Sequence, residues 1–420
     1  MKTKTKDKKK IGKRILKILI IALMIIAILT GIFAVVNVIG IKSNKNFASS
    51  VGKTEYESQL VPELDEQNGY YTFTTDRDFK IMQLTDVHIG GGFMSIKKDN
   101  MAINAVAAMV KEEKPDLVIV TGDIAYPVPF QAGTFNNKSG AEIFAGLMET
   151  LGVYWAPVYG NHDTEAYSYY DREDISELYS NKEKYPHCLF QPGDESVDGW
   201  GNYVINVKNS LGEITQSLYM FDSNAYLNDG ILGGVTWDYD CVHENQVEWY
   251  KSSLAQITEQ NGGVQPKSLA FFHIAPKEMR DAYEEYKAND FKDTEDVKYI
   301  YGKMGEKGVV VYSSEKNYGL FDSFLETGST QGVFFGHDHL NSMSILYKGI
   351  RLTYGHSVDY LAYSGISKYG AQRGCTIINV SPDGHFDCYL ENYYQDKYQT
   401  VNPKEDVTMD DFYTAEEIAG

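Results

Sequence analysis

Hydrophobic residues along this chain form short apolar runs separated by longer amphipathic stretches. Apolar, often β-branched runs predict strands at residues 80–84, 117–120 and 153–158. Ala, Val and Met at helical spacing predict helices at residues 100–114 and 141–151. This order of strand, helix and strand predicts parallel β-α-β units and therefore an α/β fold.

The second half of the chain is richer in predicted strands, which lie at residues 203–207, 216–221, 268–272, 332–335, 345–347, 351–354, 376–380 and 386–390. The last two form a hairpin around Pro382-Asp383-Gly384, since Pro presets φ and Gly accepts a positive φ. A helix is expected at residues 244–258. The polar segment 276–330 is expected to hold two helices with a loop between them.

An uncharged apolar run of 24 residues occupies positions 18–41. As a helix it is about 36 Å long, enough to cross a hydrocarbon core of about 30 Å. We interpret it as an uncleaved transmembrane anchor, with a cleaved signal peptide as the alternative. Basic residues crowd positions 1–17, so the positive-inside rule predicts a cytoplasmic tail and an extracellular body on a single-pass protein of the cell membrane.

The expected domain organisation follows from these patterns. Residues 1–17 form the tail, 18–41 the anchor, 42–75 a polar stalk, 76–395 the folded body, and 396–420 an acidic C-terminal tail. The formal net charge is −19, of which the tail contributes +8, so the remaining residues carry −27. Such an acidic body argues against nucleic acid as a bulk partner. The sequence does not indicate an oligomeric state.

Candidate chemistry lies directly after five of the predicted strands, where ligands of α/β sheets gather. The polar groups at these strand ends are Asp86, His88, Asp123, Asn161, His162, Asp163, His273, His337 and His339. Alternate residues of a strand point to the same side, so Asp86 and His88 can reach one point in space. Carboxylate, amide oxygen and imidazole suit Fe, Mn or Zn, and one shared Asp can bridge two such ions.

Together, these five motifs resemble those of calcineurin-like metallophosphoesterases, in the same order along the chain. The resemblance covers roughly residues 78–360, and the neighbourhoods of residues 271–273 and 349–363 are similar to a purple-acid-phosphatase-like branch. It implies a four-layer α/β/β/α sandwich of two mixed sheets flanked by helices. It also implies a centre of two metal ions.

The resemblance further implies a role for each residue. One metal ion would be held by Asp86, His88, Asp123 and His339, and the second by Asp123, Asn161, His273 and His337. Asp123 would bridge the two ions. His162 would stand beside the bound phosphate and protonate the leaving oxygen, and Asp163 would orient His162.

Two residues depart from the family pattern. The run Gly122-Asp123-Ile124-Ala125-Tyr126 is similar to purple acid phosphatases, in which the tyrosine ligates ferric iron. Those enzymes usually lack a histidine at the position of His88, and the two side chains would compete for the same coordination space. We expect His88 to be the ligand and Tyr126 to be a packing residue or a wall of the pocket. His356 is expected to be a surface histidine, with a place in the pocket as the alternative.

The function that follows is a membrane-anchored, outward-facing phosphohydrolase, which cleaves phosphomonoesters by attack of a metal-bound water. Two alternatives stay open. The same site would serve a phosphodiesterase or a nucleotide hydrolase, and a catalytically inactive binding module would keep the scaffold alone. No motif in the sequence identifies the substrate.

Overall fold

The computed structural model describes residues 2–66, 68–228, 236, 238–306, 308–363, 366 and 373–405, with side chains from residue 12 onward. Its elements in chain order are α1 (Lys2–Ser50), β1 (Glu63–Asp65), β2 (Tyr70–Thr74), β3 (Phe79–Leu84), α2 (Ile96–Glu113), β4 (Leu117–Thr121), α3 (Asn137–Leu151), β5 (Trp155–Val158), α4 (Arg172–Ser180), β6 (Tyr203–Lys208), β7 (Ile214–Met220), α6 (Glu244–Gln260), β8 (Lys267–Phe271), α7 (Lys277–Ala288), β9 (Val297–Tyr301), α8 (Leu320–Thr327), β10 (Thr330–Phe335), β11 (Ser344–Tyr347), β12 (Ile350–Tyr354), β13 (Gly374–Val380) and β14 (Phe386–Asn392).

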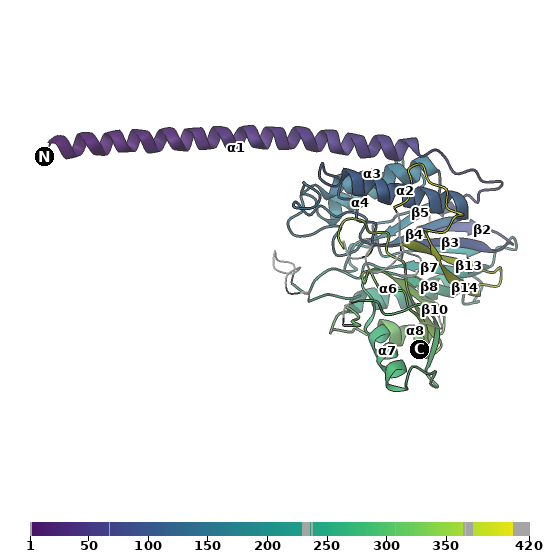
Figure 1. Ribbon diagram of the computed structural model, residues 1–420. Coiled ribbons are helices and arrows are strands. Elements are labelled where there is room, and N and C mark those ends of the chain that lie inside the picture. Colours follow the sequence, from purple (N-terminus) through teal and green to yellow (C-terminus); the bar gives the residue numbers. More distant parts are fainter. Residues whose placement is uncertain are drawn as a thin grey trace.

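Two mixed sheets form the centre of the body (Figure 1). One sheet has nine strands in the order β1-β2-β6-β7-β8-β10-β12-β11-β9, and the other has five in the order β14-β13-β3-β4-β5. Strands β3, β4 and β5 run parallel to one another, and so do β8, β10 and β12. Within each parallel set the carboxyl ends therefore lie at one edge of the sheet, where ligands of α/β folds bind.

Alternating side chains of the nine-stranded sheet contribute to two different hydrophobic cores, one on each face of the sheet. In β8, Leu269 and Phe271 belong to the core shared with the five-stranded sheet, whereas Ala270 belongs to the core under α6, α7 and α8. Helices α2 and α3 cover the outer face of the five-stranded sheet with residues such as Met109 and Phe144. The order of helix, sheet, sheet and helix confirms the predicted four-layer sandwich.

Two parts of the pattern differ from the prediction. The segment 276–330 contains the two expected helices, α7 and α8, but strand β9 lies between them and pairs with β11 at the edge of the large sheet. Within the tail expected from residue 396, Tyr398 is buried and the Glu405 carboxylate lies 3.1 Å from Nη1 of Arg373, so this part packs on the body. Residues 406–420 of that tail lie outside the described part of the chain.

The segment 42–75 packs on the body and does not form the expected stalk. Helix α1 continues to Ser50, beyond the apolar run, and strand β2 pairs with β6 in the large sheet. Asn44 and Ala48 of α1 are buried, at 0% and 1% exposure. The polar composition of this segment did not predict the packing, because a helix that buries only one narrow side shows few apolar positions.

Helix α1 is joined to the loop after β3 through one buried carboxylate. Asp99 accepts hydrogen bonds from the backbone N–H groups of Gly90 and Gly91, at 2.9 and 3.0 Å. Asp99 also accepts hydrogen bonds of 2.8 and 2.6 Å from the side chains of Ser95 and Asn44. Burial raises the pKa of Asp99 to about 7, and the donated hydrogen bonds oppose that rise. The C-terminal part of α1 is therefore part of the folded body.

Replacing Asn44 by Ala should destabilise the protein by about 1–3 kcal/mol, because the buried Asp99 carboxylate loses a donor. Thermal unfolding of the detergent-solubilised full chain measures the effect. Asn46→Ala is the matched control, since Asn46 lies two residues away on the exposed side of α1 and its loss should change little. Equal melting temperatures for the two variants would contradict this docking.

Candidate metal centre

Six strand ends bring polar side chains to one edge of the sandwich. Strands β3, β4 and β5 of the small sheet and β8, β10 and β12 of the large sheet each lead into a loop that carries them. The structure brings together the seven predicted metal ligands, Asp86, His88, Asp123, Asn161, His273, His337 and His339. The two sheets thus contribute from opposite sides to one site.

Asp123 lies at the centre of the cluster. Its Oδ2 is 3.2 Å from Nε2 of His88 and 3.1 Å from Nε2 of His273. Its Oδ1 accepts a 2.8 Å hydrogen bond from the backbone N–H of His162. Asp123 therefore contacts residues of both predicted metal shells, as a bridging carboxylate must.

Asp86 contacts the strand ends of the large sheet. Its Oδ1 lies 3.4 Å from Nε2 of His339, and its Oδ2 accepts a 3.2 Å hydrogen bond from the backbone N–H of His337. Asn161 lies on the other side of the cluster, with its Oδ1 3.2 Å from Nε2 of His273. The centroids of the His273 and His337 rings are 5.1 Å apart. The predicted ligands of the second ion are thus neighbours as well.

Asp359 is a member of the cluster that the sequence motifs did not identify. Its Oδ1 lies 3.3 Å from Nδ1 of His88, and its Oδ2 lies 3.4 Å from Nδ1 of His339. The backbone N–H groups of Leu361 and Ala362 donate hydrogen bonds of 2.6 and 2.8 Å to the Asp359 carboxylate. One carboxylate thus fixes the rings of two predicted ligands, a common arrangement behind metal-binding histidines.

The sequence signal for Asp359 is weak. Asp359 follows strand β12 by five residues, in a loop at the same edge as the other ligands, but no Asp-x-His or Gly-Asp pattern marks it. His356, in the same loop, is buried at 8% exposure, which corrects the expected surface position. Burial also lowers the pKa of His356 to about 4, so this imidazole is neutral near pH 7.

Strong electrostatic coupling holds the cluster together. Burial alone would raise the pKa of Asp123, but the imidazoles of His273 and His162 outweigh it and hold that pKa well below its usual range. The same balance, with His88 and His339, keeps the pKa of Asp359 well below its usual range. Burial lowers the pKa of His88, yet Asp359 and Asp123 raise it to about 9. These buried carboxylates therefore stay ionised only because positive charge lies next to them.

The backbone at the cluster is strained in a way that brings the ligands close. Asp86, His88 and Asp123 have φ values of 50°, 50° and 55°, in the left-handed region that residues other than glycine rarely adopt. Each such residue costs on the order of 1–3 kcal/mol, and such strain is concentrated at functional sites. Gly160 lies against the Asp123 carboxylate, where a Cβ atom would overlap with Oδ1. Glycine is therefore required there for close approach.

His162 is held by Glu165, and this corrects the predicted role of Asp163. Nδ1 of His162 lies 2.8 Å from Oε1 of Glu165, which also accepts a 3.0 Å hydrogen bond from the Tyr226 hydroxyl. The Asp163 carboxylate instead accepts hydrogen bonds from three backbone N–H groups at 2.8–2.9 Å, those of Asp123, Ala125 and Gly160. Asp163 therefore shapes the loops, because its oxygens are already occupied by backbone donors.

Tyrosine side chains surround the open side of the cluster. A cavity of about 250 Å³ is lined by His162, His337, His339 and four tyrosines, Tyr226, Tyr239, Tyr312 and Tyr363. Tyr126 packs against the rings of His88 and His162, at centroid distances of 4.8 and 5.0 Å. Tyr126 is therefore a packing residue beside the cluster and does not line this cavity.

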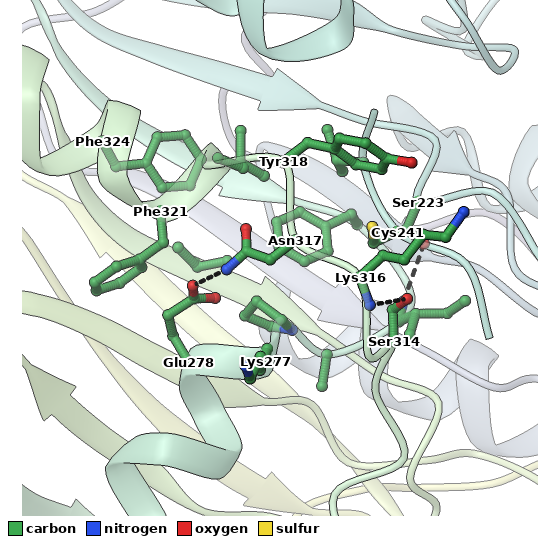
Figure 2. A pocket seen from close by; sticks show the side chains of 17 residues that line it. Ser223, Cys241, Lys277, Glu278, Ser314, Lys316, Asn317, Tyr318, Phe321 and Phe324 are labelled. Atoms are coloured by element: carbon green, nitrogen blue, oxygen red, sulfur yellow. Dashed lines mark hydrogen bonds between the residues drawn. The ribbon is translucent and has the colours of Figure 1, made fainter. Parts of the chain in front are cut away.

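A second pocket is lined by a mixture of apolar and polar side chains (Figure 2). Phe272 and Ile274, the neighbours of His273, line it together with Cys241, Phe321 and Phe324. Its cavity volume is about 40 Å³. A small-ligand site usually has roughly 300 Å³ or more. Of these two pockets, the cavity at the histidine cluster is therefore the better substrate site.

The residues of the cluster fit metal ions by their chemistry. Three groups have ligand atoms within 4.8 Å of one another: Asp86, His88 and His339; His88, Asp123 and His162; and Asp86, Asp123 and His273. The buried Oδ1 of Asp86 accepts no hydrogen bond from the described residues, and its ion-pair distance to Nε2 of His339 is a long 3.4 Å. Buried carboxylates and imidazoles in such groups are donors that Fe, Mn and Zn accept.

Comparison with known families identifies the class of protein. The family model of calcineurin-like phosphoesterases matches residues 79–341, more than half of the chain, and the chain therefore belongs to this family. Together with the clustered ligands, this makes it a metal-dependent phosphoesterase. The resemblance inferred from the five motifs is confirmed.

Individual relatives point to the purple-acid-phosphatase-like branch. The chain is 27% identical over 322 residues to "Probable inactive purple acid phosphatase 28" of Arabidopsis thaliana, covering 69% of this chain and 73% of the relative. It is 30% identical over 288 residues to "Phosphatase DCR2" of Saccharomyces cerevisiae, covering 64% of this chain and 45% of the relative. A solved dimetal phosphatase from Danio rerio aligns at 12% identity with a TM-score of 0.46, covering 76% of this chain and 100% of that one.

Replacing Asp359 by Asn should weaken metal binding at His88 and His339 about 10–100-fold, because their rings lose a charged partner. Metal titration followed by elemental analysis measures this, and binding near His273 should be retained. Asp383→Asn is the control, since the Asp383 side chain is 68% exposed in the β13–β14 turn. A titration curve for Asp359→Asn identical to that of Asp383→Asn would contradict the role of Asp359.

Proposed function

We propose that this protein is a membrane-anchored, outward-facing phosphomonoesterase with a centre of two metal ions. The observation that carries the proposal is the convergence of seven predicted ligands around Asp123. Relatives whose names include purple acid phosphatase or phosphatase support monoesters as substrates. The acidic body disfavours long polyanions, which leaves small diesters and nucleotides as the alternatives to be compared.

The clustered residues would have different roles in metal binding. Asp86, His88, Asp123 and His339 would hold one metal ion, and Asp123 would share the second with Asn161, His273 and His337. When bound, two metal ions would supply charge for the phosphoryl oxygens and acidity for a water molecule. Asp359 would keep the rings of His88 and His339 in place.

His162 is suited to protonate the leaving oxygen. Its Nδ1 is engaged by Glu165 at 2.8 Å, so Nε2 is the nitrogen left for a ligand. The His162 side chain is 28% exposed and lines the cavity, whereas His88 and His273 are buried in the cluster. The Glu165 carboxylate would hold the His162 ring in one orientation.

The apolar part of α1 supports membrane anchoring. The helix is long and apolar enough to cross a membrane, and no residue of its most apolar window is buried in the body. Asn37, inside the apolar run, donates a 2.9 Å hydrogen bond to the carbonyl of Gly133, so cleavage after the run would remove part of the fold. This favours a retained anchor over a signal sequence. Basic residues before the span favour an outward body.

Metal-loaded full-length protein in detergent should hydrolyse an aryl phosphate faster than a bis-aryl phosphate. His162→Ala should keep both metal ions but lower kcat roughly 10²–10⁴-fold, the usual contribution of an acid or base. The control is His385→Ala, because the His385 side chain is 64% exposed in the β13–β14 turn. If His162→Ala also lost a metal ion, His162 would be a ligand, as its place beside His88 and Asp123 allows.

An inactive binding module is the second candidate, because three relatives are named as probably inactive. Such a module would be expected to have lost ligands, yet all seven predicted positions and His162 are present and lie together. Bound metal without turnover of either aryl substrate would favour the module over the enzyme.

A further inference from the structure

The apolar helix and the metal centre lie toward the same end of the body. Asn44 of α1 contacts Asp99 near the start of α2, and Val51, just after α1, contacts Lys111 near the end of α2. Helix α2 therefore runs in the same direction as α1. The body lies on one side of α1, at its C-terminal end (Figure 1). Because helices of β-α-β units run opposite to their strands, the carboxyl ends of β3 and β4 face the apolar end of α1. Those ends carry the metal ligands.

Contacts with α1 show which part of this helix lies beside the loops next to the metal centre. The ring of Phe93 meets the ring of Phe33 edge-on at a centroid distance of 5.5 Å. The backbone N–H of Phe93 donates a 3.2 Å hydrogen bond to Oδ1 of Asn37, and Nδ2 of Asn37 donates a 2.9 Å hydrogen bond to the carbonyl of Gly133. The loops at Phe93 and Gly133 therefore lie beside residues 33–37 of the apolar run.

The length of the apolar run places these contacts in a bilayer. Lys17 is the last charge before the run, and about 20 helical residues cross a hydrocarbon core of about 30 Å. The core then ends close to Asn37. Asn44, which reaches the loop after His88 through Asp99, lies about 10 Å further along the helix. The metal-site loops consequently start at the level of the lipid headgroups.

Two exposed apolar side chains project from these same loops. Phe130 is 89% exposed, and Met94 is 52% exposed. The backbone N–H of Met94 donates a 3.2 Å hydrogen bond to the carbonyl of Ala132, so the two loops are joined. We define residues 93–94 and 128–133 as the docking loops. Both loops contact residues 33–37 of the apolar run, through Phe93 and Gly133, so the partner that fits their exposed apolar side chains is the bilayer interface.

We propose that the docking loops rest in the bilayer interface and that the metal centre acts on a phosphate monoester carried by a membrane lipid. This substrate class rests on the phosphomonoesterase function proposed above. Water would add to phosphorus, the bond from phosphorus to the lipid oxygen would break, and that oxygen would take a proton from His162. The proton that the attacking water loses would pass to solvent, from which His162 would regain one, so no net proton is consumed. The products are a lipid alcohol and inorganic phosphate. A headgroup phosphate at this level reaches the site while its acyl chains stay in the bilayer.

Activity on two substrates separates this inference from the proposed function. The full-length, metal-loaded protein is reconstituted in phosphatidylcholine vesicles, with phosphatidate in the vesicles or a soluble aryl phosphate outside. The double variant Met94→Ser, Phe130→Ser should lose about tenfold or more in kcat/KM on phosphatidate, since two large apolar side chains no longer enter the interface. Its turnover of the aryl phosphate should stay unchanged, because neither side chain lines the cavity at the metal centre.

The control is Leu211→Ser, because Leu211 is equally apolar and 90% exposed. It lies in the β6–β7 turn, and β7 is parallel to β8, so this turn is at the edge of the sheet opposite the metal centre. Leu211→Ser should leave hydrolysis of both substrates unchanged. An equal loss of kcat/KM on phosphatidate for Leu211→Ser and for the double variant would overturn the proposal that the docking loops rest in the bilayer interface.

Fluorescence quenching tests docking without using activity. Tryptophan introduced by Phe130→Trp should be quenched by brominated lipids beyond the background of the parent protein, whereas Leu211→Trp should not. No added quenching for Phe130→Trp overturns the inference. Hydrolysis of the aryl phosphate without hydrolysis of phosphatidate overturns the lipid substrate and leaves the proposed function standing, while absence of both activities counts against the proposed function itself.

Discussion

Buried carboxylates that need positive charge are the constraint on which this site depends. Asp86, Asp123 and Asp359 are each at most 1% exposed, and an ionised carboxylate is costly to bury unless it is compensated. In this chain the compensating partners are the imidazoles of the strand-end histidines. The carboxylates of Asp359 and Asp123 raise the pKa of His88 to about 9, although burial lowers it. Two metal ions would meet the same demand with the geometry that phosphoryl chemistry requires.

The rest of the fold serves to hold these charges together. The small sheet supplies Asp86 and Asp123 on strained, left-handed backbone, and the large sheet supplies His273 and His339 from the facing side. Helix α1 adds a second support, because Asn44 completes the hydrogen bonds around Asp99 and so steadies the loop after β3. The helix that would anchor the chain therefore also supports the site.

Much of this arrangement could be predicted from sequence because it is local. A strand followed by a short polar motif identifies Asp123 or His273. The order of strand, helix and strand predicts that the carboxyl ends of these strands lie at one edge of the sheet. What depends on loop conformation could not be predicted. The contact of Glu165 with His162, and of Asp359 with two histidines, arises only after the loops fold. The docking of α1 was missed for a similar reason, since Asn44 is an ordinary polar residue in sequence.

We propose that Asp123 would join two metal ions in one cluster, and metal content per chain tests this most directly. Full-length protein exchanged into excess Mn, Fe or Zn and then desalted should retain two equivalents by elemental analysis, and Asp123→Asn should retain neither firmly. A bridging role for Asp123 would be contradicted if the unaltered protein bound no metal, or if Asp123→Asn kept two equivalents with the affinity of the parent.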